Sequence, residues 1–354
     1  MKRLAPIALA LVCAALCLSS LRCRKDAGQA AQEKVLNVYI WSEYLPQPVL
    51  DDFKAETGIT VRVANFDSNE VLLEKLKSGV TDYDVVVPSD YMVRRLITLN
   101  LLRPIDKAKF KGFENLDPKF LDQRFDPGNR YSVPYFWGTT GIGYNEAKTG
   151  GPVDSWDVMW DRKYEGKVSM LNDGRELFAV ALQRMGKGVN ETDPAVLEQA
   201  AKMLKEQKPL VRKYDSDSFH EKLQSGDVTL AHGYNGQIAK AIAKKPDELA
   251  YAVPKEGGTF WMDNLCVPAT ARHTEAVDAF LGYVLRPEVA AKIAEGVGYG
   301  TPNQAAKARL PPAVVKNEVV YPPDEVLGRC RFMEDVGGEP AKRINELMTE
   351  IKAD

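Results

Sequence analysis

The sequence predicts an α/β protein with two domains, the first of them built on a doubly wound, mainly parallel sheet. Its 354 residues are enough for two domains, and a composition of 45% apolar and 27% charged residues is that of a soluble globular chain. Short apolar runs of strand length alternate with amphipathic helical segments, which is the order of a doubly wound sheet. Polar and aromatic residues recur directly after these runs, where open α/β sheets bind ligands.

The first 23 residues have the composition of a secretory signal. A basic start precedes a nearly continuous apolar run over 4–21, and polar sequence follows at once. We expect 1–23 to be a signal peptide, 24–34 a linker, and the mature protein to be exported. Cys23 is a candidate for the lipid-modified first residue of a lipoprotein, although the two residues before it are not the small ones expected there; cleavage near Ala31 is the alternative. A diacyl or triacyl cysteine in the mass spectrum of the native N-terminus would distinguish the two.

The mature chain is slightly acidic. Loss of Lys2, Arg3 and Arg22 with the signal lowers the 47 basic residues to 44, against 49 acidic ones. This balance argues against nucleic acid as a partner.

Cysteines and histidines indicate neither a disulfide scaffold nor a metal site. Only Cys266 and Cys330 remain after the signal, and the sequence leaves open whether they form one bridge or two free thiols. The three histidines, His220, His232 and His273, lack metal-ligand spacing and are expected at the surface or at helix caps. We expect no metal and no cofactor.

The first part of the chain alternates strands and helices. The predicted elements are a strand over 35–40, a helix opened by Pro46 and Pro48 and running through 53, a strand over 59–64, a helix over 69–77 and a strand over 83–87. Trp41, Ser42 and Tyr44 follow the first of these strands, and Ser89, Asp90 and Tyr91 follow the last. These side chains are therefore expected at one edge of the sheet.

The second α/β unit begins after an aromatic, glycine-rich stretch. Residues 131–144 are predicted to form two short extended segments that turn at glycine, and the first crossing between domains is placed there. The elements that follow are strands over 166–171, 211–214, 229–234 and 249–253, helices from 172–176 to 185 and over 194–206, 218–225 and 274–285, a helix beginning over 287–294, a loop over 298–303, and a C-terminal helix over 340–352. Asp173 is predicted to cap the helix that follows it, and Glu176, three positions later, completes the pattern of a capping box.

The stretch 255–268 carries the strongest sign of a ligand. Trp261 and Asp263 lie in a segment that otherwise has the pattern of a buried strand. A buried carboxylate must be paired or hydrogen-bonded, and an aromatic face attracts ammonium groups by roughly 0.5–2 kcal/mol. One interpretation is that the missing partner is an aliphatic amine from outside; the other is a lysine or arginine of the same chain.

Motifs of the common enzyme classes are absent from the sequence. There is no G-x-S-x-G, no G-x-x-x-x-G-K-[ST], no H-E-x-x-H and no C-x-x-C. Asp263 and Glu176 have the chemistry of a glycosidase carboxylate pair, but nothing in the sequence places them at catalytic separation. An exported protein with a polar and aromatic cleft between two lobes is best explained as a solute receptor, not an enzyme.

A series of motifs adds a family resemblance. From about Val38 the chain contains, in order, W-S-E-Y, D-V-V-V-P-S-D-Y, S-V-P-Y-F-W-G-T-T-G-I-G-Y-N, N-D-G-R-E-L-F, Y-N-G, K-E-G-G-T-F-W-M-D-N-L, L-R-P-E-V-A and Y-G-T-P-N. This order resembles the spermidine/putrescine-binding proteins of bacterial ABC polyamine importers. The resemblance implies a type II periplasmic-binding-protein fold, with two α/β lobes that close on the ligand about a hinge. It places lobe 1 at 35–138 and 262–307, and lobe 2 at 139–261 and 308–354.

The resemblance also implies the site. Its expected members are Trp41, Ser42, Tyr44, Ser89, Asp90, Tyr91, Asp173, Glu176, Tyr234, Trp261, Asp263, Tyr299 and Met333. Trp41, Tyr234 and Trp261 are expected to flank the methylene chain. Asp263 is expected to hold one nitrogen, and Asp173 with Glu176 a terminal ammonium.

Some positions depart from the family pattern. Tyr234 stands where spermidine receptors often carry tryptophan, Met333 where they carry glutamine, and Asp90 is an additional acid. Gln237 stands where putrescine-selective relatives carry an acid. These departures bear on the preferred polyamine and its affinity, not on the class of ligand, and we expect spermidine to bind more tightly than putrescine.

The implied partners are a polyamine, the membrane permease of an ABC importer and, through Cys23, a membrane surface. The protein is expected in the periplasm as a monomeric lipoprotein. Alternatives are a receptor of the same fold for another cationic solute, such as an amino acid or thiamine, a ferric-ion receptor and, last, a secreted hydrolase. The sequence does not tell which permease is served or whether the protein also senses its ligand.

Overall fold

A single mixed sheet of ten strands runs through the described part of the chain, which is residues 34–79 and 81–353 of the computed structural model. The strands are β1 (Lys34–Trp41), β2 (Ile59–Phe66), β3 (Val85–Val86), β4 (Ser132–Asn145), β5 (Val168–Met170), β6 (Val211–Tyr214), β7 (Leu230–Tyr234), β8 (Leu249–Ala252), β9 (Thr259–Cys266) and β10 (Arg331–Phe332). Their order across the sheet is β2-β1-β3-β9-β4-β7-β5-β6; β8 also pairs with β4, and β10 with β9.

Helices connect and cover these strands. They are α2 (Gln47–Thr57), α3 (Asn69–Lys77), α4 (Asp90–Thr98), α5 (Glu146–Thr149), α6 (Gly174–Arg184), α7 (Pro194–Gln207), α8 (Phe219–Ser225), α9 (Asn235–Lys244), α10 (Thr274–Val284), α11 (Pro287–Val297), α12 (Gln304–Lys307), α13 (Pro312–Val315), α14 (Asp324–Leu327) and α15 (Gly338–Ala353). Short 3₁₀ segments are η1 (Lys107–Lys109), η2 (Phe113–Asn115), η3 (Pro118–Phe120), η4 (Pro127–Asn129), η5 (Trp156–Trp160), η6 (Arg162–Tyr164) and η7 (Lys208–Leu210). None of the described helices is both long and apolar enough to cross a membrane.

Local signals explain where the longer helices begin and end. The Ser68 hydroxyl accepts a hydrogen bond from the backbone of Val71 and so caps α3. Proline opens α11, and Gly298 ends it at a φ of 87°, a conformation that a side chain disfavours. These boundaries agree with the predicted ones, because the capping chemistry is local in sequence.

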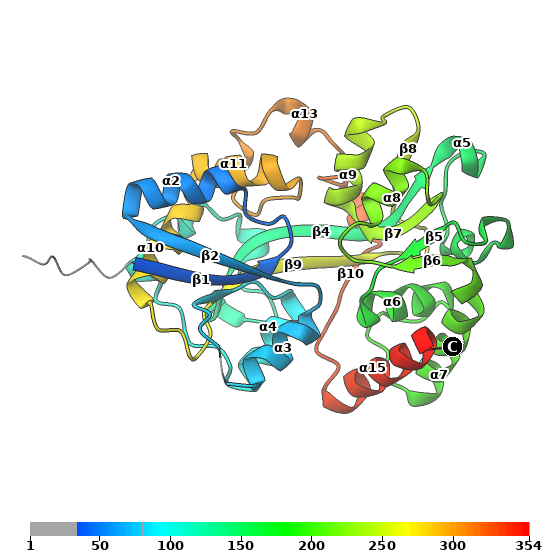
Figure 1. Cartoon of the computed structure of the whole chain (residues 1–354), viewed down its shortest axis with the longest axis horizontal. Helices are drawn as coiled ribbons and strands as arrows, with labels where there is room; N and C mark the ends of the chain where they lie inside the picture. The colour runs from blue at the N-terminus through cyan, green and yellow to red at the C-terminus, as the bar shows by residue number, and fades with distance from the viewer. Residues whose placement is uncertain (1–33, 80, 354) are drawn as a thin grey trace, which may run out of the picture. The chain divides into compact units, whose positions relative to one another are not determined.

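The sheet is mixed, with parallel pairs on both sides of an antiparallel centre that the sequence did not predict. Pairs β1–β3, β5–β6, β5–β7 and β9–β10 are parallel, whereas β9 pairs antiparallel with β3 and β4, and β4 pairs antiparallel with β7 and β8. Figure 1 shows β4 and β9 running side by side through the middle of the sheet. The antiparallel centre was missed because strand direction is decided by long-range pairing, not by the local alternation of strands and helices.

Residues 131–144 do not form two short segments. Residues 132–144 belong to one continuous strand, β4, which is 14 residues long and buried throughout. Its glycines do not form a turn but let neighbouring side chains pack closely against the strand. A Cβ on Gly138 would lie 2.5 Å from the indole of Trp261 and 2.4 Å from Oδ1 of Asn235. β4 therefore continues through the glycines where the sequence predicted a turn, and a register shift against β9 lies earlier, between Pro134 and Phe136.

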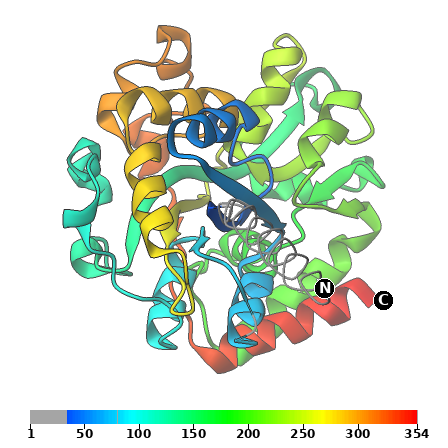
Figure 2. The same cartoon turned by 60° about the vertical axis from the view of Figure 1, so that its left-hand side comes forward.

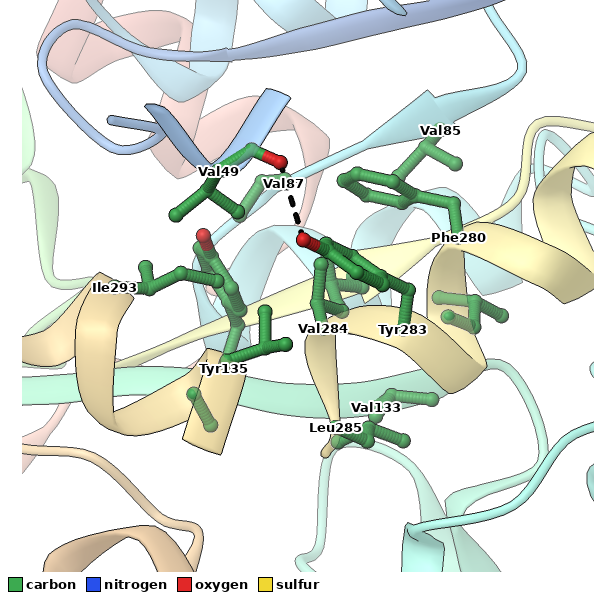
Figure 3. Packing of buried hydrophobic residues seen from close by; sticks show 14 of the residues in the cluster. Val49, Val85, Val87, Val133, Tyr135, Phe280, Tyr283, Val284, Leu285 and Ile293 are labelled. Atoms are coloured by element: carbon green, nitrogen blue, oxygen red, sulfur yellow. Dashed lines mark hydrogen bonds between the residues drawn. The ribbon is translucent and has the colours of Figure 1, made fainter. Parts of the chain in front are cut away.

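The two largest of the five buried hydrophobic clusters among the described residues divide the chain between them. One draws on residues 36–136 and 261–310, and the other on residues 142–230 and 344–351. In the first cluster, Figure 3 shows Tyr283 packed beside Val284 with its hydroxyl donating to the carbonyl of Val49, 3.3 Å away. In the second, α15 packs against α6 and α7 (Figures 1 and 2). The predicted lobe boundaries near 138 and 261 fall inside β4 and β9 and stay predictions.

The structure decides two questions that the sequence left open. Cys266 and Cys330 are both buried and free, so they do not bridge. His273 flanks the start of α10 and lies 2.8 Å from Asp84, but His220 and His232 are buried and are neither surface nor capping residues. The signal peptide, all but the last residue of the linker, and Cys23 lie outside the described residues.

Replacing Gly138 by alanine is expected to destabilise the protein by about 1–3 kcal/mol, because the new methyl group must displace Trp261 and Asn235. Denaturant unfolding measures the change. Gly188→Ala is the matched control, since no atom lies within 4 Å of its added Cβ. Equal losses in the two variants would show that the packing over Gly138 is not what requires glycine there.

Candidate ligand-binding site

All thirteen predicted site residues line one cavity. It contains about 640 Å³ of space between protein atoms, part of it open to solvent. The predicted residues in its wall are Trp41, Ser42, Tyr44, Ser89, Asp90, Tyr91, Asp173, Glu176, Tyr234, Trp261, Asp263, Tyr299 and Met333. The wall also contains four residues absent from that set: Asn69, Ser216, Asp217 and Gln237. Most of these residues follow strand ends or lie in the first turns of helices.

Asp263 lies within β9 and is 3% exposed. The hydroxyls of Tyr44 and Ser89 donate to its two oxygens, each over 2.7 Å. Burial raises the pKa of Asp263 to about 6, while the two hydroxyl donors oppose that rise. Its partners in the described chain are therefore neutral hydroxyls, not the lysine or arginine that the second interpretation required.

Asn69 holds Ser89 in place for this contact. Its side-chain oxygen accepts from the backbone nitrogen of Ser89, and its side-chain nitrogen donates to the Ser89 hydroxyl, each over 3.1 Å. The hydroxyl proton of Ser89 is thereby left to point at Asp263. Asn69 starts α3 directly after β2, so its position at a strand–helix junction was the signal that would have found it.

A second acidic group lies at the start of α6. Asp173 caps the helix by accepting from the backbone nitrogen of Glu176 over 3.0 Å, as predicted. The Glu176 carboxylate accepts from the hydroxyls of Thr140 and Thr259 instead of closing a reciprocal capping box. Burial first, and then the charges of Glu70 and Glu176, raise the pKa of Asp173 to about 7. Two carboxylates thus remain at this end of the cavity.

Asp90 is the most perturbed acid of the cavity. It accepts from the backbone nitrogens of Tyr91, over 2.6 Å, and Met262, over 2.9 Å. Burial, reinforced by the negative charges of Asp263 and Glu176, raises its pKa to about 8 in spite of these donors. Each carboxylate oxygen has a second lone pair, so Asp90 keeps the capacity to accept from a ligand.

Aromatic rings form the apolar part of the wall. Trp261 meets Tyr234 and Tyr299 edge to face, with ring centroids 5.8 and 5.0 Å apart. Tyr299 also lies 5.6 Å from Tyr44, the donor to Asp263. The rings and the acids therefore belong to one contiguous surface. The indole nitrogens of Trp41 and Trp261 are buried without a hydrogen-bond partner in the described residues.

All charged side chains that the structure describes in the cavity wall are acidic. Among the described residues that line it, Asp90, Asp173, Glu176, Asp217 and Asp263 are acidic, and none is lysine or arginine. Arg175, the basic residue within the site motifs, is buried and directs its guanidinium to the carbonyl of Glu334 and the side chain of Asn190. Carboxylates gathered in a low-dielectric site favour a cationic ligand.

Of the other three residues outside the predicted set, Ser216 and Asp217 follow β6, and Gln237 lies in the first turn of α9. The Ser216 hydroxyl accepts from the backbone of Asn172 over 2.9 Å, and Gln237 donates to the carbonyl of Asp217 over 3.4 Å. Burial, and then the charge of Asp215, raises the pKa of Asp217. Ser216 and Asp217 follow β6 in a polar run, which is the same strand-end signal that the rest of the site shows.

Comparison with known proteins supports a receptor. Residues 49–322 match the family described as bacterial extracellular solute-binding protein. The spermidine/putrescine-binding periplasmic protein of Salmonella typhimurium is 39% identical over 319 residues, 89% of this chain and 91% of that protein. The putrescine-binding periplasmic protein PotF of Escherichia coli is 36% identical over 316 residues, which cover 84% of this chain and 85% of PotF. A structure titled putative spermidine/putrescine ABC transporter, from Listeria monocytogenes, superimposes with a TM-score of 0.87 at 34% identity, covering 90% of this chain and 99% of that one. These matches confirm the type II periplasmic-binding-protein fold.

The raised pKa of Asp263 predicts how the stability of the ligand-free protein depends on pH. The folded protein holds the Asp263 proton more tightly than the unfolded chain, so the contribution of Asp263 to the free energy of unfolding falls between about pH 4 and pH 6 and is constant above that range. Asp263→Asn removes this fall, and the stability difference between variant and wild type is therefore expected to change across that window. Denaturant unfolding at pH 4, 5, 6 and 7.5 measures it; a difference that is the same at every pH would contradict the prediction.

Proposed function

This chain belongs to the family of bacterial extracellular solute-binding proteins, and we propose that it captures an aliphatic polyamine in the cavity and delivers it to the permease of an ABC importer. The single observation that carries the proposal is the set of five acids in a wall that also holds tryptophan and tyrosine and, among its described residues, no cationic side chain. The relatives named for spermidine and putrescine support the same class of ligand.

The chemistry of a polyamine suits this wall. Ammonium groups separated by methylenes need carboxylates at intervals and apolar faces between them. In the proposed complex, Asp263 accepts from one nitrogen, and Asp173 with Glu176 accepts from a terminal ammonium. The rings of Trp41, Tyr234 and Trp261 flank the methylene chain.

We propose that the protein is exported and acts outside the cytoplasm. The family consists of extracellular proteins, and the relative from Salmonella typhimurium is named as periplasmic. We propose export by the signal over 1–23 and attachment to a membrane through Cys23, as the sequence predicts. A receptor role, one ligand per monomer and no catalysis complete the proposal.

Asp263→Asn is expected to weaken spermidine binding at least about tenfold, because a charge-assisted hydrogen bond is worth roughly 1.5–3 kcal/mol. Isothermal titration calorimetry of the purified chain measures the Kd. The hydroxyls of Tyr44 and Ser89 can rotate to suit an amide, so the fold is expected to survive the change.

The control for this variant is Asp247→Asn, which changes an acid on an exposed position. It is expected to bind spermidine like the wild type. If Asp263→Asn retains wild-type affinity, Asp263 is not a ligand contact. If neither spermidine nor putrescine binds the wild type, the proposed function is wrong.

Selectivity between polyamines is proposed to depend on the end of the cavity that contains Asp90 and Met333. Spermidine has three nitrogens and putrescine two, so the longer ligand uses acids over a greater part of the wall. Met333 accepts hydrogen bonds only weakly, whereas Asp90 has free lone pairs. Gln237 lines the wall as a neutral amide and supplies no carboxylate for a short diamine.

Spermidine is therefore expected to bind more tightly than putrescine by about one to two powers of ten, or 1.4–2.8 kcal/mol. Titration of both ligands at one ionic strength and one pH decides this. Equal affinities, or tighter binding of putrescine, would show that Asp90 does not replace the acceptor that Met333 lacks.

A further inference from the structure

A second cavity lies next to the first and shares Tyr91 and Met333 with it. It contains about 1030 Å³ of space between protein atoms. Arg94, Arg124 and Glu334 in its wall are exposed, so this cavity opens to solvent. Tyr91 and Met333 are each 7% exposed and together form a partition between the two cavities.

One side of the partition is held firmly. The hydroxyl of Tyr91 donates to Glu70 over 3.1 Å, and the guanidinium of Arg175 lies 5.2 Å from the centre of its ring. The backbone nitrogen of Tyr91 donates to Asp90. Contacts at the ring face, the hydroxyl and the backbone leave this side chain little freedom to move.

The other side has a fixed backbone and a flexible side chain. Asn190 donates to the carbonyl of Phe332 over 3.0 Å and accepts from the backbone nitrogen of Glu334 over 2.8 Å, so it clamps the chain on both sides of Met333. The parallel pairing of β10 with β9 ends at Phe332 and adds to this restraint. Methionine is unbranched and has three rotatable side-chain bonds, so its thioether is the part of the partition that can move.

The chemistry of the second cavity differs from that of the first. It contains two arginines, Arg94 and Arg124, neither of which is paired with a carboxylate in the described residues. The wall contains two acids, Glu334 and Asp335. Asp335 lies 3.9 Å from the guanidinium of Arg95, so Glu334 is the one acid of the wall without a basic partner in the described residues. Guanidinium groups bind carboxylates in a planar, two-pronged geometry. This cavity therefore suits an anionic group better than another ammonium.

We propose that the two cavities form one composite site for a polyamine that carries an acidic substituent on a terminal nitrogen. The amine chain occupies the acidic cavity, the linking methylenes pass between Tyr91 and Met333, and the carboxylate lies against Arg94 and Arg124. Met333 acts as the specificity-determining residue, since its side chain sets the width of the passage. This inference rests on the proposed polyamine function.

Matched ligands test the composite site. Titration calorimetry compares N1-succinylspermidine with N1-butanoylspermidine, in which a methyl group replaces the carboxylate. Because acylation removes the same ammonium from both, their difference reports on the carboxylate alone. The succinyl compound is expected to bind the full chain about fivefold more tightly, as solvent-exposed arginines allow.

Variants of the second cavity test whether its arginines cause the preference for the succinyl compound. In the double variant Arg94→Gln/Arg124→Gln the preference is expected to fall to about one, with spermidine affinity unchanged, because neither arginine lines the first cavity. Met333→Ala is expected to strengthen binding of both conjugates relative to spermidine by about threefold, since the passage widens. The double variant changes only exposed side chains and carries the test if Met333→Ala fails to fold.

Each remaining outcome overturns the inference. It is wrong if the butanoyl compound binds as tightly as the succinyl compound, or if the preference survives loss of both arginines. It is also wrong if Met333→Ala gains affinity for spermine and not for the succinyl compound, because the second cavity then accepts an ammonium. Spermidine binding with rejection of both conjugates refutes this inference alone, whereas failure of spermidine itself refutes the proposed function and the inference with it.

Discussion

The buried carboxylate of Asp263, in the middle of the antiparallel strand β9, is the constraint around which the cavity is arranged. Tyr44 reaches it from the loop after β1 and Ser89 from the start of α4, and Asn69 orients Ser89. Burying a charge costs several kcal/mol unless donors meet it. These segments, far apart in the sequence, must therefore come together for β9 to carry an acid at all.

The acids of the proposed site are costly to bury in the ligand-free protein. Asp90, Asp173 and Asp263 all have raised pKa values, chiefly because burial removes water from them. Hydroxyls and backbone nitrogens partly stabilise their charges, but no full positive charge lies in the described wall. In the proposed complex a bound cation supplies that charge, so ligand binding and folding stability are coupled through the same groups.

Continuous strands hold these groups in register. β4 and β9 pair from Ser132 and Cys266 to Thr140 and Thr259, which keeps Trp261 and Asp263 on a rigid support. Gly138 lets the Trp261 ring lie directly over β4. Where the first cavity borders the second, hydrogen bonds to Asn190 hold the backbone on both sides of Met333. In the proposed composite site, the flexible side chain of Met333 is the element that discriminates among ligands of different length.

The sequence by itself determined those helices and strands whose boundaries depend on residues close together in the chain. Helix α3 was predicted with its observed bounds because its cap and its apolar spacing lie within a few residues. The thirteen residues predicted for the site, which follow strand ends or match family motifs, all line one cavity. Tertiary structure alone decided the antiparallel centre of the sheet, the continuity of β4 and the partners of Asp263 and Glu176. Each of these depends on pairing between residues distant in the chain, for example the hydroxyl of Thr259 with Glu176. A sequence pattern records which residues are buried, whereas contacts across the fold determine what each buried group meets.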